Sequence, residues 1–258
     1  MTLSLLLLLF IAFIGLTLGS FANVYFYRYP ENLSVTQPRS FCTHCRTPIS
    51  WFDNIPVLSY LYLRGKCRFC KASISIQYPL VELVVGLLFG AAAFKLQAQP
   101  VHVLAAFLVY VCFIFLIGGI DFATFLKNER KFGVIPDHLT LPLALAGAAF
   151  SAFNPLLNFS PWAGLACGTA VGALMAAFRW MAGKILKQEA LGMGDVKMMA
   201  GVAAWLGWKG ALVTLMTGSV LGTLAALPFM FKGQMNRSSP VPFGPFLALG
   251  ALSAFFFV

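Results

Sequence analysis

Long apolar stretches recur along the whole chain and leave little of it to face water. A helix that crosses a bilayer needs about 20 mostly apolar residues, and about eight segments approach this requirement. They lie at residues 3–27, 79–94, 103–120, 139–153, 162–178, 198–208, 211–231 and 243–258. The sixth is short, so it either begins before its apolar run or is a broken or re-entrant helix. The pattern predicts an all-α integral membrane protein with about eight transmembrane helices.

The composition excludes an ordinary soluble domain. Of the 258 residues, 60% are apolar and only 10% are charged, whereas about a quarter of the residues in soluble domains are charged. A chain this apolar also has enough surface to bury, which disordered chains do not have. The lipid bilayer is therefore its expected surroundings.

The positive charge is unevenly distributed between the connections. Sixteen of the 18 Lys and Arg residues fall in the first, third, fifth and seventh connections, and only Lys95 and Lys209 fall in the others. Basic connections stay on the cytoplasmic side of a membrane. We therefore expect these four connections to face the cytoplasm and both termini to lie on the opposite side. The net charge of +10 then reflects membrane orientation, and no nucleic-acid partner is predicted.

Residues 28–78 form the only sizeable polar segment and carry four of the six cysteines. These are arranged as Cys42-x-x-Cys45 and Cys67-x-x-Cys70. Two such pairs are typical of tetrahedral zinc sites, so a cytoplasmic zinc-binding loop is predicted after the first helix. Disulfides are the alternative, although a reducing compartment disfavours them, and a redox site would need only one pair.

Two of the eight acidic residues lie where apolar segments meet the predicted cytoplasmic face. Asp121 directly follows the apolar run of the third segment, and Asp195 closes the string Gly192-Met193-Gly194-Asp195. An ionisable group at membrane depth is costly and indicates function. The glycines allow close approach of the backbone, so both carboxylates are expected at one depth on one face.

Three interpretations of these carboxylates stay open at this point. Held within a few ångströms, they would share a proton and could activate water, as in aspartic proteases. Held farther apart, they could bind a cation or relay protons in a transporter. Each could also be a helix cap or a juxtamembrane charge.

Six short strings decide between these interpretations by resemblance. They are GSFANV at 19–24, WFDNIPVLS at 51–59, QYPLVE at 77–82, IPDHLTLP at 135–142, GMGDVK at 192–197 and PFGPF at 242–246. In this order, over nearly the whole chain, they resemble the bacterial prepilin peptidases, also called type IV leader peptidases.

The resemblance implies a membrane aspartic endopeptidase that removes the basic leader of prepilins and pseudopilins after a Gly at the cytoplasmic membrane face. Many members then methylate the new N-terminus with S-adenosylmethionine. By the same resemblance, the catalytic pair is Asp121 and Asp195, Gly192, Gly194 and Lys197 support the site, and Cys42, Cys45, Cys67 and Cys70 bind zinc.

One departure from the family pattern concerns the first catalytic residue. Members place the Ile-Pro-Asp string about seven residues after it, whereas an extra charged region at 125–132 separates Asp121 from Pro136 here. Asp137 is therefore a possible substitute for Asp121, although its position after a proline and before a helix is also that of a cap. The role of the extra region is not predicted.

Several further expectations complete the sequence-based account. By the same resemblance, residues 1–27 form the first transmembrane helix, residues 28–78 a cytoplasmic tetracysteine domain that is associated with methyl transfer, and residues 79–258 a polytopic protease domain. Lys197 either acts on Asp195 or only sets topology, and Glu82 either faces the site or caps a helix. The expected location is the bacterial inner membrane. A cation or proton-coupled transporter and a non-catalytic pilus or secretion assembly factor are the alternative functions, and no oligomeric state is predicted.

Overall fold

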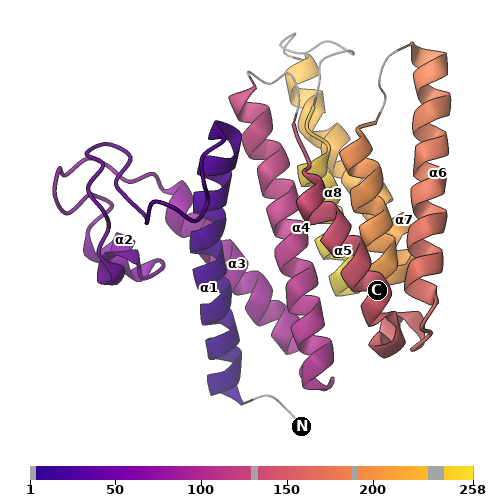
Figure 1. Cartoon of the computed structure of the whole chain (residues 1–258), viewed down its shortest axis with the longest axis horizontal. Coiled ribbons are helices and arrows are strands. Elements are labelled where there is room, and N and C mark those ends of the chain that lie inside the picture. The colour runs from indigo at the N-terminus through magenta and orange to yellow at the C-terminus, as the bar shows by residue number, and fades with distance from the viewer. Residues whose placement is uncertain (1–3, 129–132, 188–190, 232–240, 258) are drawn as a thin grey trace. The chain divides into compact units, whose positions relative to one another are not determined.

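The computed structural model describes residues 4–128, 133–187, 191–231 and 241–257, and these residues form helices and loops without a β-strand. The all-α prediction is therefore confirmed for the part of the chain described. The helices are α1 (Leu5–Arg28), α2 (Leu58–Tyr62), α3 (Gln77–Lys95), α4 (Val101–Lys127), α5 (Asp137–Phe150), α6 (Ala163–Leu186), α7 (Met193–Phe231) and α8 (Gly244–Phe257) (Figure 1). Four short 3-10 helices lie at Tyr29–Glu31, Trp51–Asn54, Ser151–Phe153 and Pro155–Leu157.

The chain forms two compact units, Met1–Leu108 and Val109–Val258. Helix α4 begins in the first unit and continues into the second. The division of the chain into three parts at residues 27 and 78 stays a prediction.

Within the part of the chain that the structure describes, five helices are long and apolar enough to cross a membrane, namely α1, α3, α4, α6 and α7. Helices α5 and α8 have 14 residues each, which at 1.5 Å per residue is shorter than the hydrocarbon core of a bilayer. A membrane protein is thus supported, while the count of eight spans stays a prediction.

The sixth and seventh expected segments form one helical region with a break. Helix α7 is interrupted at Gly207, whose φ of 68° and ψ of −173° are not helical. A positive φ of this kind is readily adopted by glycine alone. The part of α7 before the break begins at Met193, as expected if the sixth segment starts before its apolar run.

In the first unit, α1 and α3 lie side by side (Figure 1). Small residues allow this approach: a Cβ on Gly15 would lie 2.7 Å from both the Cβ of Phe89 and the carbonyl oxygen of Val85, and one on Gly19 would lie 2.7 Å from the Cα of Glu82. Close packing over glycine is a usual source of stability between helices in lipid. It brings Ser20 of α1 and Glu82 of α3 to the same crossing.

In the second unit, Trp205 of α7 joins several helices. Its indole nitrogen donates to the carbonyl oxygen of Leu143 in α5 at 2.8 Å, and its ring centroid lies 5.5 Å from that of Tyr110 in α4. The Tyr110 hydroxyl in turn donates to the carbonyl oxygen of Ala251 in α8 at 3.1 Å. These satisfied polar groups fix α4, α5, α7 and α8 of this unit against one another.

We expect Gly15→Ala to lower the free energy of unfolding by about 1–3 kcal/mol, because the added methyl group meets backbone and no flexible side-chain end. Gly90→Ala, in α3 of the same unit, is the matched control, since its Cβ would meet only the Cβ of Ala12, at 3.6 Å. It should be neutral or stabilising by up to about 1 kcal/mol. Unfolding of the purified variants in detergent measures both values, and equal stabilities would contradict this packing.

Candidate active site and metal centre

Asp121 and Asp195 are brought together in the second unit from residues 74 positions apart in the sequence. Asp121 lies about two turns before the end of α4, and Asp195 lies in the first turn of α7. The two residues are only 5% and 8% exposed, and their carboxyl groups lie close enough to interact electrostatically. Two buried carboxylates that interact electrostatically can share one proton. One of them can then act as an acid while the other acts as a base.

Each carboxylate accepts one backbone hydrogen bond from a glycine. The N–H of Gly244, at the start of α8, donates to Asp121 Oδ2 at 3.1 Å, and the N–H of Gly192 donates to Asp195 Oδ2 at 3.2 Å. Because helix N-termini attract negative charge, the first turn of α8 is well placed to hold Asp121. Gly192 is thus a direct partner of Asp195, as its place in the sequence string suggested.

Two glycines leave room for the carboxylate of Asp121. A Cβ on Gly244 would lie 2.7 Å from Asp121 Oδ2, and a Cβ on Gly133 would collide with Asp121 Oδ1. The segment that carries Gly133 is fastened to α4, where the Val134 N–H donates to Thr124 Oγ1 at 2.8 Å. Sequence reasoning singled out the string around Gly244 without giving it a role. The pair Gly244-Pro245 at the start of a helix is the sequence feature that could have indicated a role for Gly244.

Asp137 lies in a different environment from Asp121 and Asp195. Its side chain is 58% exposed and forms an ion pair with Lys197 Nζ at 2.7 Å. Lys197 therefore pairs with Asp137 and not with Asp195. Residues 129–132 of the extra charged region lie outside the described residues, as does Glu189.

Gly194 lies against the segment that precedes α5. A Cβ at Gly194 would be 2.6 Å from the Cβ of Ile135. The Gly192–Lys197 string thus contacts the Ile135–Asp137 string at two points, through Gly194 and through Lys197. The structure brings together two strings that the sequence analysis could only relate by resemblance.

The four cysteines of the polar loop form one cluster in the first unit. The sulfur atoms of Cys42, Cys45, Cys67 and Cys70 all lie within 4.8 Å of one another, and all four are free thiols. Each pair lies in a short hairpin closed by one antiparallel bridge, Phe41 to Pro48 and Lys66 to Ser73. The predicted convergence of the pairs is confirmed, and the cluster can hold a metal ion.

The thiols of this cluster differ in acidity. Hydrogen bonds from the side chain and backbone of Thr47 lower the pKa of Cys45 to about 6. Backbone hydrogen bonds from Cys70 and Phe69 lower the pKa of Cys67. For Cys70, the backbone of Ala72 lowers the pKa, but burial and the three neighbouring thiols outweigh it and raise the pKa to about 11. The cluster cannot easily hold four thiolates without a cation.

An ion pair connects the second cysteine hairpin to the segment between the pairs. Arg68 Nε donates to Asp53 Oδ2 at 2.7 Å, and its guanidinium lies over the ring of Phe52, 5.3 Å from the centroid. The same guanidinium lowers the pKa of Asp53. This contact holds the WFDNIPVLS string against the cysteine cluster.

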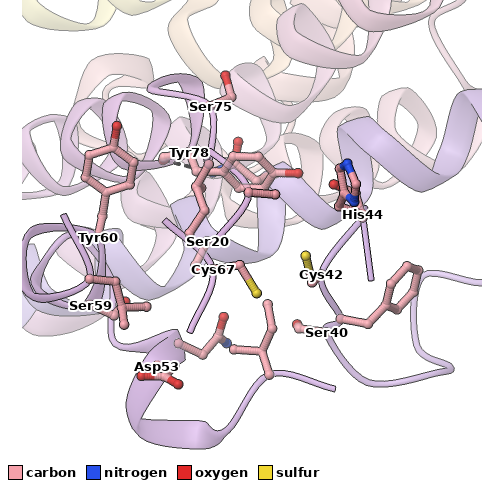
Figure 2. Close-up of a pocket in the computed structure, with 18 of the residues that line it drawn as sticks. Ser20, Ser40, Cys42, His44, Asp53, Ser59, Tyr60, Cys67, Ser75 and Tyr78 are labelled. Carbon is pink, nitrogen blue, oxygen red and sulfur yellow. Dashed lines mark hydrogen bonds between the residues drawn. The ribbon is translucent and has the colours of Figure 1, made fainter. Parts of the chain in front are cut away.

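A cavity of about 520 Å³ lies beside the cluster, and all of its lining residues belong to the first unit. Figure 2 shows Cys42 and Cys67 on its wall together with Ser20, Asp53 and Tyr78. Asn23 and Glu82 also line it. Asn23 stands inside the GSFANV string, where a polar residue in an apolar helix was the signal for a role.

Comparisons with known proteins agree with this arrangement. The family model "Bacterial Peptidase A24 N-terminal domain" matches residues 13–96, and the model "Type IV leader peptidase family" matches residues 130–227. No solved structure matches the chain. The two family models thus fall largely on the two compact units.

The curated relatives described next are among those that carry the name prepilin leader peptidase/N-methyltransferase. The protein of Aeromonas hydrophila is 39% identical over 221 residues, which cover 85% of this chain and 71% of the relative. That of Burkholderia pseudomallei strain K96243 is 32% identical over 276 residues, covering 97% and 85%. That of Klebsiella pneumoniae is 39% identical over 216 residues, covering 80% and 87%.

The cysteine cluster should bind about one divalent ion per chain. Cys45→Ser should lose this ion, whereas Cys112→Ser, which changes a cysteine of α4 outside the cluster, should retain it. Elemental analysis of the purified variants measures the content.

Metal affinity should also fall as the pH is lowered from 8 towards 6, because the ligands bind metal as thiolates. Cys70, with its raised pKa, releases its proton on binding, and Cys45 begins to take up a proton near pH 6. An affinity that does not change with pH, or a metal content that survives Cys45→Ser, would contradict this metal centre.

Proposed function

Because this chain belongs to the prepilin leader peptidase/N-methyltransferase family, we propose that it cleaves the basic leader of prepilins and pseudopilins and methylates the new N-terminus. The observation that carries the peptidase proposal is the pair of buried, interacting carboxylates at Asp121 and Asp195. The comparisons do not favour a transporter or a non-catalytic assembly factor.

We propose the following division of labour for cleavage. One carboxylate of the pair, ionised, takes a proton from water as the water oxygen attacks the scissile carbonyl carbon. The other, protonated, polarises the carbonyl oxygen, and the amine leaves with a proton as the C–N bond breaks. The two groups titrate as a pair. Gly244 and Gly192 each donate an N–H to one oxygen of a carboxylate, so they position the pair.

The position of the pair suits the proposed substrate. Asp121 and Asp195 lie near the ends of membrane-length helices. A prepilin presents a basic leader on the cytoplasmic side and an apolar helix in the bilayer, so its scissile bond reaches this depth. The basic connections of the chain support a site that faces the cytoplasm.

For the cysteine cluster we propose zinc. Four thiolates in a compact set favour zinc over harder divalent ions such as magnesium. Its role would be structural: with no free ligand position, it would fix the two hairpins and, through Arg68 and Asp53, the segment between them.

S-adenosylmethionine, when bound, would supply the methyl group for the second activity. The first unit fits such a molecule in one testable respect. Its cavity has a buried side-chain acceptor, Asn23 Oδ1, that has no hydrogen-bond partner. A ligand with N–H or O–H donors would satisfy it.

Asp121→Asn and Asp195→Asn should each reduce the rate of prepilin cleavage by at least about 100-fold, because each removes one half of the acid and base pair. Asp137→Asn is the matched control and should stay within a few-fold of the parent, since Asp137 is exposed and paired with Lys197. Cleavage of a purified prepilin in detergent measures this. Loss in Asp137→Asn with activity in Asp121→Asn would move the first carboxylate, and activity in both Asp121→Asn and Asp195→Asn would refute the pair.

Gly244→Ala should lower kcat for cleavage by at least about 10-fold, because its methyl group displaces the carboxylate of Asp121. Gly222→Ala is the control in the same unit, since its Cβ would meet nothing nearer than the Phe246 ring at 3.4 Å. Thermal unfolding shows whether each variant is folded. Unchanged cleavage by a folded Gly244→Ala variant would contradict the positioning role.

A further inference from the structure

The segment that leads into α5, residues 133–136, passes both carboxylates of the proposed active site. A Cβ on Gly133 would lie 2.7 Å from Asp121 Cγ, so the backbone of the segment lies against that carboxylate. Further along, Ile135 packs on Gly194, the residue before the second carboxylate, where an added Cβ would lie 2.6 Å from the Cβ of Ile135. A displacement of this segment would therefore change the surroundings of both carboxylates.

One side chain of α4 fastens this segment. The hydroxyl oxygen of Thr124 accepts a hydrogen bond from the N–H of Val134 at 2.8 Å. The same hydroxyl donates back to its own helix, to the carbonyl oxygens of Ile120 at 2.8 Å and Asp121 at 3.0 Å. Thr124 is 4% exposed, and a buried hydroxyl that both donates and accepts is held in one orientation. Thr124 therefore fixes the position of Val134 and, through it, that of Gly133.

This hydrogen bond is what ties the backbone of the segment to α4. Among the described residues, the bond between Thr124 and Val134 is the one hydrogen bond that residues 133–135 make. The covalent connection does not fix the segment, because the extra charged region at 125–132 lies in between. An extended chain covers about 3.3–3.6 Å per residue, so this length could reach much farther than the 2.8 Å between the bonded atoms. The hydroxyl of Thr124 thus closes the connection at its base.

We propose that Thr124 is a positioning residue for cleavage. Its hydroxyl holds the 133–136 segment against the two carboxylates and so keeps Asp121 in the geometry that the reaction needs. The inference rests on the proposed cleavage by the carboxylate pair and adds a residue outside that pair. Misplacement of a reacting group by about 1 Å can cost about 100-fold in rate, so release of the segment should slow the chemical step.

Thr124→Val removes the hydroxyl and keeps a side chain of nearly the same shape, so Val134 loses its acceptor. We expect kcat for cleavage of a purified prepilin by the full chain in detergent to fall about 10-fold or more, with KM changed less than about 3-fold, because positioning acts on the reacting groups. Thr124→Ser keeps the hydroxyl and should retain kcat within about 3-fold of the parent.

Thr214→Val is the matched control in the same unit. Thr214 is also buried, and its hydroxyl donates to the carbonyl oxygen of Gly210 in its own helix at 2.8 Å. Among the described residues, this hydroxyl accepts no hydrogen bond from another segment. The variant loses a hydroxyl of the same kind without releasing a segment, so its kcat should stay within about 3-fold of the parent.

Hydrogen–deuterium exchange shows whether the segment is released. In Thr124→Val, the peptide that contains Val134 should exchange several-fold faster than in the parent, because its N–H has lost its hydrogen bond. A peptide from the first turn of α7 should exchange at the parental rate, and the thermal unfolding midpoint should be unchanged. A general loss of stability would instead raise exchange in both peptides.

Three results would overturn the positioning role. They are parental kcat in folded Thr124→Val, an equal loss of kcat in Thr124→Ser, and parental exchange of the Val134 peptide in Thr124→Val. If Thr124→Val cleaves normally while Asp121→Asn and Asp195→Asn do not, the positioning role is wrong and the proposed function stands. If the parent itself leaves the prepilin uncut, the proposed function fails.

Discussion

Two carboxylates are buried near the ends of apolar helices, and the proposed chemistry depends on this burial. Asp121 and Asp195 repel one another when both are ionised, and burial makes each charge costly. One backbone hydrogen bond stabilises each carboxylate, donated to Asp121 by Gly244 and to Asp195 by Gly192. Two carboxylates held in this way do not easily both ionise, and a shared proton is what the proposed cleavage requires.

The first unit also depends on polar groups, which here hold a long loop in place. Its loop buries few apolar side chains, and large ones such as Trp51 and Tyr62 are exposed. The cysteine cluster and the Arg68–Asp53 ion pair therefore hold the loop together. Helices α1 and α3 then supply the floor of a cavity whose polar groups are incompletely satisfied. The proposed cleavage site and the cysteine cluster thus draw on separate sets of residues in separate compact units, so each can be altered while the other is kept.

Sequence patterns predicted the chemistry better than the geometry. The spacing of the cysteines was enough to predict that all four form one cluster, because two short hairpins allow few other arrangements. It could not show that Lys197 pairs with Asp137, since that contact joins residues 60 positions apart. Likewise, the string around Gly244 gave no role, because its contact with Asp121 depends on how α8 packs on α4. The break at Gly207 was only suggested, by a segment too short to span.

The most direct test of the central claim is the proximity of residues 121 and 195 in the native membrane. Cysteines would be introduced at both positions of a chain without its other cysteines, with a protease site inserted at residues 129–132. After treatment with a short thiol crosslinker and cleavage at that site, we expect the two fragments to stay joined. A cysteine pair within α4 is the control that the crosslinking reaction works. If that control pair is linked but the two fragments separate even with crosslinkers of about 10 Å reach, residues 121 and 195 are not close.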